Sequence, residues 1–119
     1  MANLLLFING GLAFDKQDAI TVISNLKGTI NTKEGQMIGA VFECVYKAFG
    51  RKTIIRLSDN LETISCSSTG DEALTFALEL TKTLGLPLRA IDSDYSFDIE
   101  LAEINTLAEF KKAIELENN

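Results

Sequence analysis

The sequence predicts an α+β domain: a two-layer α/β sandwich in which helices cover one face of a mainly antiparallel sheet. Three observations support this class. Short apolar or β-branched runs, at 4–8 and 53–57, are bounded by turn residues, as strands are. Longer amphipathic stretches begin with helix-capping residues. Residues 92–103 alternate acidic and apolar side chains, which is typical of a strand with one buried face.

The start of the chain predicts a strand, a turn and a helix. The apolar run 4–8 is the strand, and Asn9-Gly10-Gly11 is the turn that ends it. Asp15 is the expected N-cap of the helix, and Gly28 is its expected stop. Apolar residues recur between them at helical spacing, so one face of this helix should pack against the sheet.

The segment 36–49 fits both a strand and a helix. Alternate residues from Ile38 to Tyr46 are apolar, whereas Met37 and Val41 belong to an apolar set at helical spacing. We favour a strand because Gly39 weakens a helix and the β-branched run 53–57 follows directly after a turn. A third strand is then expected over 62–66.

The second half of the chain predicts two helices around a pair of strands. Thr69 and Glu72 have the spacing of a capping box, and the helix they begin should end at Gly85. Strands are expected at 88–91 and in the acidic segment, and Thr106 should cap a final helix. The element order is therefore βαβββαββα in a single domain, residues 1–119, whose second sheet face is partly open.

Charge is distributed unevenly along the 119 residues. Residues 1–58 hold seven Lys or Arg against four Asp or Glu, or +3, and residues 59–119 hold four against thirteen, or −9, for a net charge of −6. Because nucleic-acid binding relies on Lys and Arg, this balance argues against a nucleic-acid partner and favours a cationic protein. We expect no membrane segment, a cytoplasmic location, and free buried thiols at Cys44 and Cys66.

The residue types needed for most catalytic sites are missing. The chain has no histidine, and it contains no CxxC, HExxH or phosphate-loop motif, so we expect neither an enzyme nor a metal or other cofactor. The Gly10-Gly11 loop precedes a helix, where backbone amides can meet a phosphate, but Asp15 at the cap would repel an anion. A plain turn is the favoured interpretation of this loop.

Five carboxylates between residues 92 and 103 are the candidate partner-binding residues: Asp92, Asp94, Asp98, Glu100 and Glu103. Their spacing partly matches a calcium-binding loop, but Phe97 stands where that loop needs glycine. As a strand, the segment would point Tyr95, Phe97 and neighbouring apolar residues into the core and its carboxylates outward. The simpler alternative is that these charges protect a sheet edge from pairing with other chains.

In size, acidity and lack of catalytic residues the chain resembles the single-domain immunity proteins and inhibitors that bacteria use to block basic nuclease toxins. The resemblance implies a non-enzymatic protein whose carboxylates occlude the cationic substrate site of a partner. One alternative is a small-molecule-binding or enzymatic domain that uses the Gly10-Gly11 loop. Another is a structural domain that self-associates, as a homodimer for example, through its open sheet face.

Overall fold

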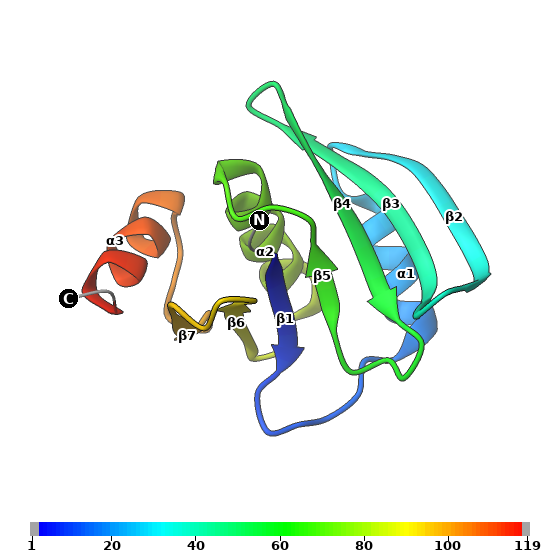
Figure 1. Ribbon diagram of the computed structural model, residues 1–119, viewed down its shortest axis with the longest axis horizontal. Coiled ribbons are helices and arrows are strands. Elements are labelled where there is room, and N and C mark those ends of the chain that lie inside the picture. The colour runs from blue at the N-terminus through cyan, green and yellow to red at the C-terminus, as the bar shows by residue number, and fades with distance from the viewer. Residues whose placement is uncertain (1–2, 118–119) are drawn as a thin grey trace.

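The computed structural model describes residues 3–117 and confirms the predicted α+β class (Figure 1). Within these residues, seven strands form one antiparallel sheet and three helices pack against it. In chain order the elements are β1 (Leu4–Ile8), α1 (Lys16–Asn25), β2 (Thr29–Met37), β3 (Ala40–Ala48), β4 (Arg51–Ser58), β5 (Ile64–Cys66), α2 (Asp71–Leu84), β6 (Leu88–Asp92), β7 (Asp98–Glu100) and α3 (Leu107–Glu117).

The strands lie in the order β2-β3-β4-β5-β1-β6-β7, so β2 and β7 are the sheet edges. The apolar run of β1 is explained by its place, because β1 pairs with β5 on one side and β6 on the other. Its alternate residues Leu4, Leu6 and Ile8 point into the core. At the end of β1, Gly10 and Gly11 adopt φ of 97° and 79°, which confirms a turn at this position.

The ambiguous segment 36–49 is a strand, as favoured, but a turn at Ile38-Gly39 divides it. The structure also adds one strand, β2, to the expected order. β2 is an edge strand whose pairing with β3 contains two register shifts, one of them at Asn31 with φ of 55°. Bulges interrupt the alternation of side chains, so β2 lacks the period of two by which strands are predicted.

The helices form one layer, in which α2 contacts both α1 and α3 (Figure 1). Between this layer and the sheet lies the core, where Phe42, Phe76 and Phe110 are fully buried. The rings of Tyr46 and Phe76 meet edge to face with centroids 5.3 Å apart, an arrangement that aromatic quadrupoles favour. In the part of the chain that the structure describes, no helix is long and apolar enough to cross a membrane.

The other face of the sheet carries no helix among residues 3–117. Side chains that alternate with the core residues point to this side, and so does Ile30, the register partner of Val45. Seven of these side chains are apolar and at least partly exposed: Leu5, Phe7, Ile30, Val41, Val45, Ile54 and Ile91. We call this side the open face.

Two of the expected local structures are corrected. The acidic segment is a turn followed by the three-residue strand β7, and Tyr95 lies in that turn at φ 56° and 80% exposed, outside the core. Phe97 is buried as expected. At α2 the cap residue is Gly70, with no side-chain cap, and Glu72 instead accepts a hydrogen bond from the Ser68 hydroxyl (2.7 Å).

The other two predicted caps are confirmed. The carboxylate of Asp15 accepts a hydrogen bond from the Asp18 amide at the start of α1 (2.9 Å). The hydroxyl of Thr106 accepts one from the Glu109 amide at the start of α3 (3.1 Å).

Candidate protein-binding surface

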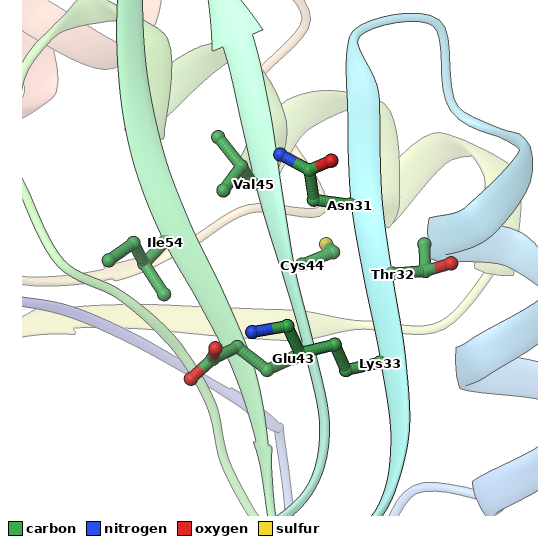
Figure 2. Close-up of a pocket in the computed structure, with 7 residues that line it drawn as sticks. All are labelled: Asn31, Thr32, Lys33, Glu43, Cys44, Val45 and Ile54. Carbon is green, nitrogen blue, oxygen red and sulfur yellow. The ribbon is translucent and has the colours of Figure 1, made fainter.

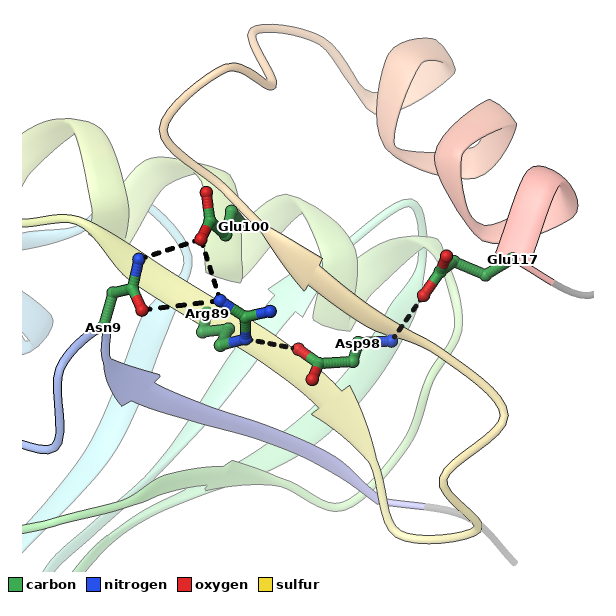
Figure 3. Close-up of polar contacts among 5 residues, drawn as sticks. All are labelled: Asn9, Arg89, Asp98, Glu100 and Glu117. Carbon is green, nitrogen blue, oxygen red and sulfur yellow. Dashed lines mark hydrogen bonds and ion pairs between the residues drawn. The ribbon is translucent and has the colours of Figure 1, made fainter.

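Asp98 and Glu100 lie together on the open face, because Ile99 between them points into the core. The β6–β7 pairing places Arg89 directly opposite Glu100. Figure 3 shows the Arg89 guanidinium between the two carboxylates, with Nε 2.6 Å from Oδ1 of Asp98 and Nη1 2.8 Å from Oε1 of Glu100. The Asn9 amide donates to the same Glu100 oxygen (3.0 Å), so the network is ordered by two strands besides β7.

Arg89 balances only one of these two carboxylates. Its hydrogen bond to Asp98 is the main cause that raises the pKa of its guanidinium, and Glu100 adds to the effect, so Arg89 stays charged. A third carboxylate, on Glu117 of α3, accepts a hydrogen bond from the outward-facing Asp98 amide (3.3 Å). The network of one cation and three carboxylates is therefore acidic on balance. Glu117 also accepts a hydrogen bond from a backbone N–H on the outer edge of β7, where another chain could otherwise pair.

Asp92 does not belong to the exposed surface. It is 5% exposed, and its carboxylate accepts hydrogen bonds from the amide (2.6 Å) and the hydroxyl of Ser96. These contacts close the turn between β6 and β7. Asp92 is thus occupied by its own turn and cannot meet a partner as the sequence spacing suggested.

Asp94 and Glu103 flank β7 in the chain, and both are exposed. Beside Asp94 stands the exposed ring of Tyr95. Four of the five predicted carboxylates therefore lie exposed in or beside β7. Over residues 88–117, which form β6, β7 and α3, the chain has eight Asp or Glu against three Lys or Arg, a net charge of −5. We call this part of the molecule the acidic end.

The two thiols are buried and chemically inert. Cys44 on β3 and Cys66 on β5 are the register partners of Ile55 on β4 from opposite sides, so their Cα atoms are about two strand spacings, or about 10 Å, apart. A disulfide needs less than about 7 Å. Burial, with a smaller effect from Glu43, raises the pKa of Cys44 to about 12, and burial also raises the pKa of Cys66, so neither is a thiolate near neutral pH.

Three hollows are candidates for a small-molecule site, and none has the form of one. A hollow of about 400 Å³ lies between the end of α2 and residues 101–105, and most of its lining residues are exposed. A trough of about 410 Å³ lies on the open face beside the bulge of β2, and most of its lining side chains are exposed or half-exposed (Figure 2). The hollow beside Gly11 is about 190 Å³, below the roughly 300 Å³ at which ligand pockets begin. Among the described residues no cluster of Cys, Asp or Glu could hold a metal ion.

Comparison with known proteins finds no relative from which a role could be transferred. No protein-family model matches the chain, and no curated protein and no solved structure matches it significantly.

Sequence reasoning missed Arg89 and Asn9 as members of the acidic network. The position of Arg89 was predictable in principle, because it alternates with the apolar Leu88 and Ala90 and so points away from the core. Its pairing with Glu100 depends on the register set by the five-residue connection 93–97, which sequence alone does not give. Asn9 follows β1 and lies 80 residues before Arg89 and 91 before Glu100 in the chain.

Proposed function

We propose that the protein is a non-enzymatic binding protein whose acidic end recognises a cationic protein partner, as inhibitors of basic nucleases do. The observation that carries this proposal is the exposure of Asp94, Asp98, Glu100 and Glu103 in or beside β7. A single arginine, Arg89, lies among them, so negative charge remains available to a partner.

The mechanism is electrostatic attraction followed by steric occlusion. The negative charge of the acidic end raises the rate at which a positively charged partner associates. Its carboxylates then pair with the Lys and Arg side chains that the partner would otherwise use to bind phosphates. Arg89 and Asn9 limit the motion of Asp98 and Glu100, so less side-chain entropy is lost when a partner binds.

Non-catalytic function is supported by the chemistry of the described side chains. The chain lacks histidine, and its two thiols have raised pKa values. The polar atoms of the acidic network are engaged with one another, and none faces an enclosed pocket. Reduced, buried cysteines also fit the cytoplasm, which we propose as the compartment.

Affinity capture from the host tests this function with matched variants. The test variant is Asp94→Asn/Asp98→Asn/Glu100→Gln, and the control is Asp59→Asn/Glu62→Gln/Glu79→Gln, which removes the same charge at exposed positions elsewhere. Wild type and control should retain a basic protein at low salt and release it at high salt, and the test variant should not retain it. Equal retention by all three proteins would refute the role of the acidic end.

A further inference from the structure

We propose that two copies of this chain pair through their open faces, with the half of the sheet around β3 and β4 in one copy lying over the acidic end of the other. The two copies would be related by a two-fold axis that runs along the strands between the sheets. Such an axis reverses the strand order of one sheet over the other, so β2 of each copy faces β7 of its partner.

The open face is an uncovered, partly apolar surface. Its seven apolar side chains come from β1, β2, β3, β4 and β6, so they extend across most of the sheet. Val45 and Ile54 are direct register partners and form an exposed apolar pair. Seven strands of this length make a face of roughly 30 Å by 20 Å, or about 600 Å² in projection, close to the ~800 Å² per partner of a standard interface.

The two ends of this face carry opposite charge. Residues 29–58, which form β2, β3 and β4, hold five Lys or Arg against two Asp or Glu, a net charge of +3, whereas the acidic end has −5. Both charged sets reach the open face: Lys33, Lys47 and Lys52 on one half, Asp98 and Glu100 on the other. The register pairs place Lys33 and Asp98 at the two ends of one row that crosses the sheet, so a two-fold axis along the strands brings Lys33 of each copy over Asp98 of the other. Lys47 and Lys52 lie at the end of the sheet that holds the β6–β7 turn and its Asp94.

The pairing of Lys47 with Lys52 is unfavourable within one copy. They are register partners across β3 and β4, which places their Cβ atoms about 5 Å apart, and like charges in this arrangement destabilise a sheet. Among residues 3–117, neither ammonium group has a carboxylate within ion-pair distance. An external carboxylate would relieve this repulsion, and the β6–β7 turn of a second copy supplies the exposed Asp94 at the same end of the sheet.

Two exposed aromatic residues point to the same arrangement. Phe49 in the β3–β4 turn and Tyr95 in the β6–β7 turn both have φ of 56°, and they are 64% and 80% exposed. Bulky residues rarely adopt this conformation, because it strains the backbone. Burial against a second copy would offset that strain, since aromatic anchors contribute much of the binding energy of interfaces.

The strand register places these two turns at the same end of the sheet. Ile55 pairs with Cys66, Cys66 with Leu4, and Leu4 with Asp92, so these residues form one row across the sheet. The β3–β4 turn precedes Ile55 in β4, and the β6–β7 turn follows Asp92, so both lie beyond the same side of the row. An axis along the strands therefore brings Phe49 of each copy to the end at which Tyr95 of the other copy lies.

Sedimentation velocity with charge-swapped variants tests this dimer. At about 0.01 M ionic strength, where the Debye length is about 30 Å, wild type should sediment at twice its 13.0 kDa mass, and it should dissociate partly at about 0.15 M. Lys47→Glu/Lys52→Glu and Asp94→Lys should each be monomeric. Mixed in equal amounts they should form a heterodimer, because both opposite-charge contacts are restored. Lys16→Glu/Lys27→Glu, which changes α1 and its following loop, is the charge-matched control and should dimerise.

A monomeric wild type at every concentration, or reversed variants that stay monomeric when mixed, would overturn this inference. Circular dichroism of each variant alone excludes unfolding as the cause. The partner and the second copy compete for Asp94 and Asp98, yet the two proposals fail separately. Lys47→Glu/Lys52→Glu loses the dimer but keeps the carboxylates that a cationic protein would bind, and a monomeric wild type leaves that binding intact.

Discussion

The five carboxylates between residues 92 and 103 have different roles because the backbone changes direction between them. Asp98 and Glu100 lie on β7 and both pair with Arg89, whereas Asp94 and Glu103 are exposed in the segments before and after β7. Asp92 ends β6, and its side chain folds back onto Ser96. Sequence spacing identifies such residues as acidic and near one another, but only the turn geometry decides which of them a partner can reach.

Replacing Asp92 tests its structural role. Asp92→Ala removes the buried carboxylate that accepts two hydrogen bonds from Ser96, so the free energy of unfolding should fall by about 1–3 kcal/mol. Asp92→Asn keeps one carbonyl acceptor and should lose less. Urea denaturation measures both, and an Asp92→Ala variant as stable as wild type would show that the turn forms without these bonds.

Cys44 should make stability depend on pH in the alkaline range. Burial raises the pKa of its thiol from 9.0 to about 12, so the folded protein holds this proton more tightly than the unfolded chain. The resulting stabilisation is complete below pH 9 and is lost as the pH rises towards 12. Cys44→Val should therefore show a flatter decline in unfolding free energy above pH 9 than wild type. Parallel declines would contradict a raised thiol pKa.

At the scale of elements, the structure differs from expectation where sheet edges and turns govern the chain. β1, α1, β4, α2 and α3 follow apolar periodicity and end at turn or capping residues, so they were predictable. β2 was not, because bulges and exposed polar residues remove the periodicity of an edge strand. The outward position of Tyr95 was not predictable either, because the alternation of acidic and apolar residues runs through the turn sequence as well as through the strand.

Replacing Phe49 in the β3–β4 turn should stabilise the fold and weaken dimerisation. Its central residues Phe49 and Gly50 both have positive φ, 56° and 71°, the type I′ geometry that Asn-Gly satisfies best. Phe49→Asn should raise the unfolding free energy by about 1 kcal/mol through relief of backbone strain. It should also weaken the proposed dimer. A variant that gains stability and dimerises as tightly as wild type would remove Phe49 from the interface.

The connection between α1 and β2 depends on Gly28. This residue has φ of 112°, and a Cβ atom there would lie 2.6 Å from the backbone oxygen of Lys47. The Gly28 oxygen also accepts a hydrogen bond from the Lys47 amide (2.9 Å), so the two segments cannot separate freely. Gly28→Ala should cost about 1–3 kcal/mol in thermal or urea unfolding. Gly10→Ala, with no atom within 4 Å, controls for the positive φ alone.

At the scale of the whole molecule, the sheet order separates the charges. The basic segment 29–58 occupies one side of the sheet and the acidic end the other, along the longest axis of the molecule (Figure 1). The molecule therefore has an electric dipole, with the segment 29–58 as its positive side and the acidic end as its negative side. Such a dipole would orient the proposed cationic partner towards β7 before any contact forms.

The association rate of the captured basic partner, measured against ionic strength, tests this recognition most directly. Wild type should associate at least about tenfold faster at 0.01 M than at 0.15 M ionic strength, as steered encounters do. Asp94→Asn/Asp98→Asn/Glu100→Gln should lose most of that dependence, and the control Asp59→Asn/Glu62→Gln/Glu79→Gln should keep most of it. A rate that does not change with salt, or that falls equally in both variants, would contradict recognition through the acidic end.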